Sequence, residues 1–411
     1  MKDLEQAGPP VRPKERQLRP EEHQLPLLRG WLAVVALAVG TFAVVTSEML
    51  PVGLLTPMGG SLRVSDGVAG VTLTITGLVA ALSAPLLTSL LGRFDRRAVL
   101  CALLAVLAAG NLAAAWAPDF AVMVAARVLV GIGMGGVWAV AAGLAVRLVP
   151  ARSVPAATSL VFSGIAVASV LGVPAGTYLG ELAGWRTAFV AAAGLSLAVL
   201  VALAVLLPRL PAQRALALGG VLRLGRRPRV RTGLLVVAFL VTGHFAAYTY
   251  VRPVLESVSA AGPGTLGTLL LVYGVAGVAG NFAAGAGAAR SPRRTVLVIG
   301  AALAATALLI VLVLPATGGS PIVAGVLMAV WGLTYGGVSV STQSWLLAAA
   351  PEAGEGASAL FVGVFNGAIA LGALAGGLVA DGAGVTAVLW LAAALAGAAL
   401  VAAGAGRAPG D

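Results

Sequence analysis

Charged residues are scarce in this 411-residue chain: together they make up 10% of it, against about 25% in a typical soluble domain. So few charges cannot cover a globular surface with solvated groups. The chain is also 59% hydrophobic, which excludes a disordered polymer, because disorder requires low hydrophobicity. Lipid is therefore expected to cover most of the surface.

Cysteine and histidine are rare as well. The single cysteine, Cys101, lies inside an apolar run and can form neither an intrachain disulfide nor a metal cluster. With only His23 and His244 there is no credible Ser/His/Asp set for hydrolysis. The sequence also has no Gly-rich phosphate loop, no paired carboxylates for a magnesium diphosphate and no repeated channel filter. We predict that the chain is not an enzyme and holds no metal.

Long apolar runs are abundant. A helix needs roughly 20 apolar residues to cross about 30 Å of hydrocarbon, and twelve runs qualify. They cover residues 31–55, 67–91, 98–116, 120–146, 156–180, 187–207, 232–255, 265–289, 295–314, 322–349, 357–380 and 385–405. The predicted fold is an all-α integral membrane protein of about twelve transmembrane helices.

The positive charges are unevenly distributed. Of the 26 Lys and Arg residues, 22 lie in the two tails, the central loop and the loops after spans 2, 4 and 8. Basic residues concentrate on the cytoplasmic side of membrane proteins. We therefore predict a bacterial inner-membrane protein with both termini cytoplasmic, although the loop 351–356 carries no basic residue. Because topology accounts for the net charge of +11, no nucleic-acid partner is expected.

The second half of the chain repeats the first. Arg-x-x-Arg-Arg-x-Val-Leu at 93–100 recurs at 290–297, and the glycines of span 5 recur in span 11 at an offset of 200, where Glu181 matches Asp381. Parallel repeats of this kind, with the binding site between them at the midplane, define one transporter architecture. We predict two six-helix bundles, 31–207 and 232–405, joined by a basic linker, 208–231, with a disordered tail at 1–30 and a short tail at 406–411.

Four stretches carry a family resemblance. They are the end of span 1 (46–55, Thr-Ser-Glu-Met-Leu-Pro-Val-Gly-Leu-Leu), the start of span 4 (127–135), Gly-Val-Pro-Ala-Gly at 172–176 in span 5, and the basic turn after span 2. Together they resemble the major facilitator superfamily, in particular its drug:proton antiporters of the arabinose-efflux and actinobacterial chloramphenicol-exporter type. The resemblance implies alternating-access efflux of a drug-like molecule such as chloramphenicol, driven by a proton gradient without a cofactor. Sugars or nucleosides and purines are the alternative substrates; a membrane enzyme or a channel is the alternative of another class.

Ionisable residues within spans mark function by default. Glu48 in span 1 and Arg127 in span 4 lie at similar predicted depths, and His244 lies near the middle of span 7. We predict that these three couple transport to protons, Glu48 by taking up and releasing one as its hydration changes. For each, the competing interpretation is a static structural bond.

Polar and aromatic span residues are candidates for the substrate site, or else for helix packing. They are Trp138, Phe245, Tyr248, Tyr250, Asn281, Gln343 and Asn366.

The candidates for gating are the basic turn and the span-5 stretch. In the turn Gly92 stands where the family has its relay aspartate, so Asp95 is the candidate substitute. The residues are Arg93, Asp95, Arg96, Arg97, Gly172, Pro174 and Gly176. Pro174 predicts a bend with a smooth contact face. The expected partners are a small-molecule substrate and the bilayer, and a monomer is the working expectation.

Overall fold

The computed structural model describes residues 26–91, 94–141, 144–150, 153–208, 223–259, 262–351 and 354–405, and the secondary structure of these residues is helical. The N-terminal bundle consists of α1 (Leu27–Leu62), α2 (Asp66–Leu90), α3 (Arg96–Ala115), α4 (Phe120–Ala141), α5 (Ala145–Leu148), α6 (Val154–Val167), η2 (Ala168–Gly172), α7 (Val173–Ala183) and α8 (Trp185–Leu206). The C-terminal bundle consists of α10 (Pro228–Tyr248), α11 (Val251–Val258), α12 (Pro263–Arg290), α13 (Pro292–Ala316), α14 (Pro321–Gly336), α15 (Val338–Ala349), α16 (Gly354–Ala383) and α17 (Ala387–Ala405).

Eleven helical stretches of the described chain are long and apolar enough to cross a membrane. This confirms the predicted all-α membrane fold of about twelve helices. The remaining predicted span, span 5, is not one continuous α-helix. It runs through α6, the single π-turn η2 and α7. Pro174 has no N–H for the helical ladder, and a π-turn just before it accommodates the missing bond. The expected bend is therefore a change of helix type.

Two other predicted spans are interrupted. In span 7 a first helix, α10, ends at Tyr248, and a second helix, α11, begins at Val251. The helix breaks here because Pro253 has no N–H to donate to the Thr249 carbonyl four residues earlier. Span 10 is divided into α14 and α15 at Gly337. Each break lies within a bundle, where neighbouring helices can satisfy the freed backbone groups.

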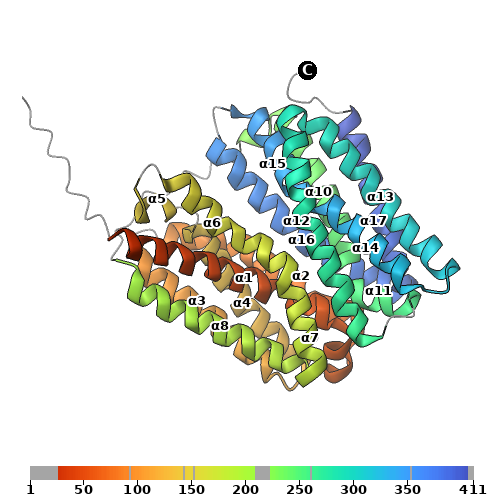
Figure 1. Ribbon diagram of the computed structural model, residues 1–411, viewed down its shortest axis with the longest axis horizontal. Helices are drawn as coiled ribbons and strands as arrows, with labels where there is room; N and C mark the ends of the chain where they lie inside the picture. The colour runs from red at the N-terminus through yellow and green to blue at the C-terminus, as the bar shows by residue number, and fades with distance from the viewer. Residues whose placement is uncertain are drawn as a thin grey trace, which may run out of the picture.

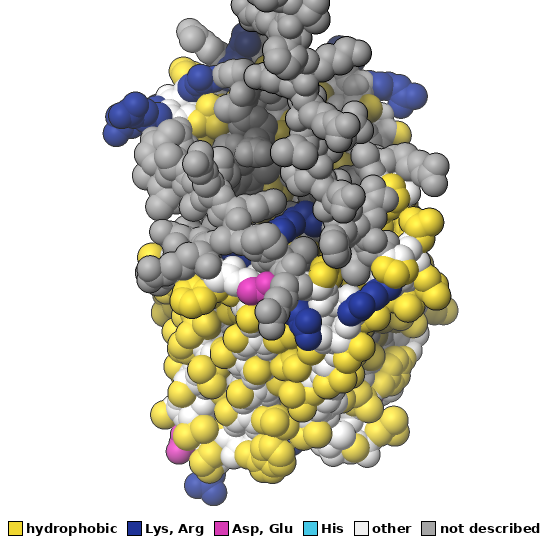
Figure 2. Space-filling view, turned by 90° about the vertical axis from the view of Figure 1, so that its left-hand side faces the viewer, with side chains coloured by type: hydrophobic (Ala, Val, Ile, Leu, Met, Phe, Trp, Pro, Cys, Tyr) yellow, Lys and Arg dark blue, Asp and Glu magenta, His cyan; other side chains and the backbone are white. Residues whose placement is uncertain are grey.

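The two bundles lie side by side (Figure 1) and meet along two extensive pairs of helices and a smaller contact between α1 and α11. Helix α2 packs against α16, while η2 and α7 pack against α12. These pairs join span 2 to span 11 and span 5 to span 8, which is the pairing that a two-fold axis between duplicated halves requires. Figure 2 shows that apolar side chains cover the lower part of one face, while Lys and Arg gather in the upper part.

Within each bundle, glycines allow the equivalent pair of helices to approach closely. In α4, Gly131 and Gly135 face the backbone of α2, and in α14, Gly332 and Gly336 face the backbone of α12. A Cβ atom at Gly336 would overlap the carbonyl oxygen of Gly277. In lipid the hydrophobic effect does not drive helices together. Small residues at such crossings instead allow the close van der Waals packing that does.

We expect Gly336→Ala to destabilise the C-terminal bundle by about 1–3 kcal/mol, because the backbone of α12 must move away from the new methyl group. The matched control is Gly325→Ala in the same helix, where the nearest atom would be a Leu269 methyl carbon at 3.8 Å. Thermal unfolding of the detergent-purified protein measures both variants. Equal melting temperatures for the two would contradict the close crossing.

Candidate functional site

Glu48 and Arg127 lie together in the centre of the N-terminal bundle. Glu48 of α1 is 5% exposed and Arg127 of α4 is fully buried. The guanidinium donates to the backbone carbonyls of Ser47 (2.8 Å) and Glu48 (2.9 Å), and Nε donates to that of Thr72 on α2 (3.3 Å). Arg127 therefore ties three helices together through their backbones while it remains close enough to the Glu48 carboxylate for the charges to interact.

Pro51, the first proline in α1, explains why the carbonyl of Ser47 is free to accept a hydrogen bond from Arg127. Pro51 lies inside the helix and has no N–H, so the carbonyl of Ser47, four residues earlier, loses its usual donor. Arg127 occupies that vacant position. A second proline, Pro57, frees the carbonyl of Gly53 in the same way, and Nη1 of Arg252 donates to it at 2.8 Å. Each proline of α1 is thus matched by one buried arginine.

Several buried polar atoms near Glu48 have no partner in this conformation. They include Oε1 of Glu48, Oγ1 of Thr46 and Oδ1 of Asn111, whose Nδ2 donates to the Ser47 hydroxyl at 2.9 Å. Unpaired buried polar atoms are costly and uncommon in native proteins. The unpartnered Glu48 oxygen therefore marks a place where a ligand, a proton or water can complete the hydrogen bonding.

The C-terminal bundle contributes an aromatic cluster instead of charges. Its members are His244, Phe245, Tyr248, Tyr273, Trp331 and Tyr335, from α10, α12 and α14. The Tyr335 ring lies parallel to the His244 ring with 3.3 Å between centroids, and the Tyr248 and Tyr273 rings stack at 4.7 Å. The cluster is a rigid wall of flat rings.

Tyr335 is the member of the aromatic cluster that comes near enough to Glu48 for the two to interact electrostatically. It is partly exposed, and its hydroxyl has no hydrogen-bond partner. One half therefore offers a carboxylate acceptor, and the other offers aromatic faces and phenol hydroxyls. This division of chemistry is suited to a flat ligand with polar substituents.

Span 5 packs on α1 through its glycines. A Cβ at Gly172 would meet Thr46, and one at Gly176 would meet Leu50. Gly180, one turn further, faces Leu54. The predicted contact face therefore exists, and it holds span 5 directly against the helix that carries Glu48.

One end of the interface between the halves is closed by polar contacts, which we call the outer latch because the predicted topology places this end outside. Asp381 of α16 accepts hydrogen bonds from the Ser65 hydroxyl (2.6 Å) and the Gly67 amide (3.0 Å) at the start of α2. Arg252 reaches across to the Gly53 carbonyl and forms an ion pair with Glu256 at 2.9 Å. The matched repeat residues Glu181 and Asp381 both belong to it, since Glu181 lies 3.9 Å from Arg252.

Tyr250, predicted as part of the substrate wall, lies in the outer latch and not in the aromatic cluster. Its hydroxyl donates to the Ala373 carbonyl at 2.8 Å, and its ring fills the space left by Gly70 and Gly376. The predicted wall residues Phe245 and Tyr248 do belong to the cluster.

The remaining predicted residues are spread over the bundle. Asn281 is exposed on α12, Gln343 is partly buried on α15, and Asn366 donates to the Val362 carbonyl of its own helix at 2.9 Å. The side chain of Trp138 lies outside the described residues. The structure therefore gathers Glu48, Arg127, His244, Phe245 and Tyr248 in the buried interior of the two bundles, but not Asn281, Gln343 or Asn366.

The basic turn after span 2 leads directly into α3. Asp95 caps that helix by accepting from the Ala98 amide at 3.1 Å, Arg96 is 9% exposed and Arg97 is partly buried. Arg93 lies outside the described residues. The gating role of this turn stays a prediction.

Sequence reasoning missed Tyr273, Trp331 and Tyr335. A signal was present: four of the five tyrosines of the chain lie in its second half, and Trp331 and Tyr335 are one helical turn apart. It also missed Arg252. The spacing of four residues from Glu256 indicates an ion pair on one helix, but only the structure shows that Arg252 also crosses the interface to the Gly53 carbonyl, which Pro57 leaves without a helical donor.

Comparison with known proteins agrees with this architecture. Residues 37–362 match the model of the Major Facilitator Superfamily, and the chain belongs to this family. It is therefore a multi-pass membrane transporter of the family and not an enzyme.

Two curated relatives are similar to this chain over most of its length. The chain is 38% identical over 373 residues to a Pseudomonas aeruginosa protein named transcription regulatory protein OpdE, covering 89% of this chain and 91% of that one. It is 34% identical over 362 residues to the purine ribonucleoside efflux pump NepI of Escherichia coli K12, covering 88% and 90%. Among solved structures, the nucleoside transporter NupG superposes with a TM-score of 0.72 at 15% identity over 91% of this chain and 98% of that chain, which shows the shared fold.

Proposed function

We propose that this protein exports a nucleoside-like molecule from the bacterial cytoplasm in exchange for protons, with Glu48 as the proton-carrying group. The observation that carries the proposal is the buried Glu48 carboxylate with an unpartnered oxygen, placed opposite an aromatic cluster with an unpartnered Tyr335 hydroxyl. An aromatic base can stack on flat rings, and sugar hydroxyls can donate to a carboxylate.

The exchange mechanism follows from competition for one carboxylate. A charged carboxylate buried in a membrane is costly unless it binds a proton or hydrogen-bond donors. Glu48 would therefore release substrate when it takes up a proton on the outer side and regain substrate after it loses that proton to the cytoplasm. Arg127 keeps the backbone around Glu48 in place through its bonds to the Ser47 and Glu48 carbonyls.

A nucleoside is preferred over a drug because of the relative that is 34% identical over most of both chains and is named as a purine ribonucleoside efflux pump. Chloramphenicol, the substrate suggested by the antiporter motifs, is the second candidate; the aromatic cluster would hold its nitrophenyl ring equally well. The proposal uses the predicted orientation, with both termini cytoplasmic.

We expect Glu48→Gln to abolish proton-driven accumulation while substrate exchange continues. In inverted membrane vesicles with an acidic interior, one pH unit supplies about 1.4 kcal/mol per proton, enough for roughly tenfold accumulation of radiolabelled inosine by the wild type. The glutamine variant should reach only the external concentration, because it cannot bind the exchanged proton. Unlabelled inosine trapped inside should still exchange with label.

Asp119→Asn is the matched control, because it removes a carboxylate at the exposed start of α4, away from the centre of the bundle. The asparagine oxygen can still accept from the Val122 amide, as Asp119 does at 2.9 Å. Accumulation by Glu48→Gln at the wild-type level would refute the proton role of this residue. Gradient-driven uptake of chloramphenicol but not inosine would keep the coupling and overturn the substrate. If the reconstituted wild type moves neither compound, both candidate substrates are wrong and the proposed function fails, while membership of the transporter family stands.

A further inference from the structure

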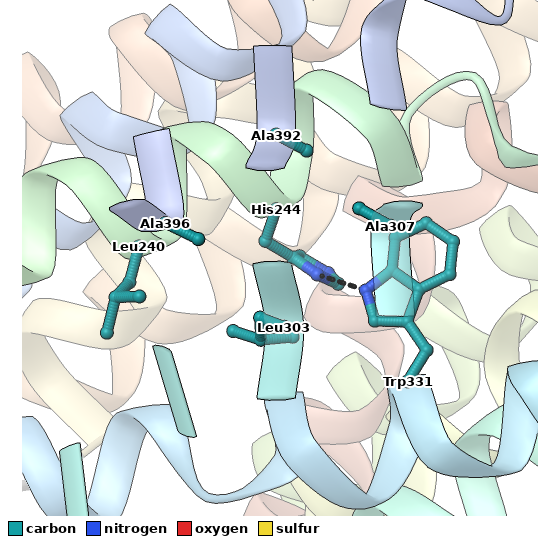
Figure 3. A pocket seen from close by; sticks show the side chains of 7 residues that line it. All are labelled: Leu240, His244, Leu303, Ala307, Trp331, Ala392 and Ala396. Atoms are coloured by element: carbon teal, nitrogen blue, oxygen red, sulfur yellow. Dashed lines mark hydrogen bonds between the residues drawn. The ribbon is translucent and has the colours of Figure 1, made fainter. Parts of the chain in front are cut away.

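His244 forms two hydrogen bonds with aromatic side chains, and Figure 3 shows the one with Trp331. Nδ1 of the imidazole lies 3.2 Å from Nε1 of Trp331, which points at it from α14. Nε2 lies 3.3 Å from the hydroxyl of Tyr273 on α12. Both nitrogens of the ring are therefore engaged, and the ring is stacked against Tyr335.

The bond from Trp331 determines where the imidazole hydrogen is. An indole N–H can only donate, so Nδ1 must offer its lone pair and cannot carry a hydrogen. In the neutral ring the hydrogen must then be on Nε2, which donates to the Tyr273 hydroxyl. A protonated imidazole would have N–H groups at both nitrogens, and the one at Nδ1 would point at the N–H of Trp331.

The surroundings of the ring offer no counter-charge among the described residues. The groups that face it are the phenols Tyr248, Tyr273 and Tyr335 and the rings Phe245 and Trp331. Behind it is a small cavity, with room for about one water molecule, whose other walls are apolar. They are Leu240 of α10, Leu303 and Ala307 of α13, and Ala392 and Ala396 of α17. The Glu48 carboxylate interacts electrostatically with Tyr335 of the cluster.

We propose that Trp331 holds His244 as a neutral imidazole with its hydrogen on Nε2, so that His244 is a positioning residue for Tyr273 and not a carrier of the coupled proton. This replaces the proton-coupling role that the sequence suggests for His244. Because the Tyr273 hydroxyl accepts from His244, its own hydrogen is available to a further acceptor. The C-terminal half then supplies a phenol donor, and the N-terminal half supplies the Glu48 acceptor.

This arrangement defines what the ligand must carry. A matching molecule has a flat ring with an acceptor atom for the phenol donor and a hydroxyl or amino donor for Glu48, without a net charge. Purine nucleosides have this pattern. In this respect the inference rests on the proposed function, but the state of the His244 ring does not depend on which substrate is transported.

The direct test is the ¹⁵N NMR spectrum of histidine-labelled protein. The chain has two histidines, so His23→Gln leaves His244 as the single signal. We expect the spectrum of a neutral ring with its hydrogen on Nε2, unchanged between about pH 5 and 8, where a free histidine titrates. In Trp331→Phe the bond to Nδ1 is lost, and the signal should become pH-dependent. A His244 signal that titrates in the Trp331-containing protein would overturn the proposal.

Transport kinetics provide the second measurement. In His244→Gln the amide oxygen can accept from Trp331 and the amide N–H₂ can donate to Tyr273, so the pH profile and the proton-driven accumulation should both be retained. His244→Leu supports neither bond and should raise KM roughly five- to tenfold, as loss of one hydrogen bond does, with coupling still intact. Uncoupling by His244→Gln would return the proton role to this residue. Failure to transport nucleosides at all would leave the NMR result standing and would count only against the proposed function.

Discussion

Replacing Arg127 with methionine is expected to destabilise the N-terminal bundle strongly. The side chain is fully buried, and its loss leaves the carbonyl of Ser47, which Pro51 deprives of a helical donor, without a hydrogen bond. A buried unpaired group costs about 1–3 kcal/mol, and the lost bonds to the Glu48 and Thr72 carbonyls add to this cost. Thermal unfolding of the purified protein should record this loss, together with a lower yield of monodisperse protein.

Pro51→Ala tests whether the vacant Ser47 carbonyl causes this loss of stability, because alanine has an N–H that can donate to that carbonyl. In the Arg127→Met background this exchange should recover part of the lost stability, whereas in the wild type it has no vacant carbonyl to satisfy. Arg127→Lys is the intermediate case, since an ammonium group cannot spread its donors over three carbonyls as a planar guanidinium does. Additive effects of the two exchanges would show that Arg127 stabilises the bundle by some other contact.

Weakening the outer latch is expected to shift the protein toward a conformation open on that side. Arg252 joins the halves through the Gly53 carbonyl and is held in position by Glu256. In Arg252→Gln the ion pairs are lost, and an inter-half bond of about 1.4 kcal/mol would change the population of the open state roughly tenfold. Pro57→Ala should act in the same direction, because the new N–H competes with Arg252 for the same carbonyl.

Two spin labels can follow this opening. In a Cys101→Ala background, Gly60→Cys on α1 and Ser257→Cys on α11 place exposed labels on opposite halves at the latch. The electron-electron distance distribution should gain a longer component in Arg252→Gln and in Pro57→Ala. Arg290→Gln is the matched control, because Arg290 donates to the Ala286 carbonyl of its own helix. Unchanged distances in both latch variants would mean that other contacts close this end.

The two halves of the proposed site differ in how well the sequence predicts them. Glu48 and Arg127 stand out because a charge within an apolar run is costly in lipid and is seldom retained without a role. The aromatic cluster does not, because a tyrosine or tryptophan in a membrane span is compatible with an interfacial anchor, a packing contact or a ligand wall. Tyr248 and Tyr250 are two residues apart and share one predicted role, yet the break before α11 sends one into the cluster and the other into the outer latch.

The hydrogen bonds of His244 and of Arg127 could not be predicted for a related reason. A span pattern reports the kind of environment that a side chain enters but not which partner it meets. The prolines of α1 do tell which carbonyls lack a helical donor, since each lies four residues before a proline. That Arg127 and Arg252 supply the donors depends on contacts across 80 and 199 residues of chain.

The class of this protein follows from its sequence alone: its scarcity of charge requires lipid around it, and its duplicated motifs require two similar bundles, because both properties are summed over many residues and tolerate local error. The site depends on packing between distant segments. Helix α1 contributes a carboxylate oxygen without a partner, while α10, α12 and α14 together form the wall of aromatic rings. The hydrogen of His244 is fixed by a single indole N–H, 87 residues away in the chain.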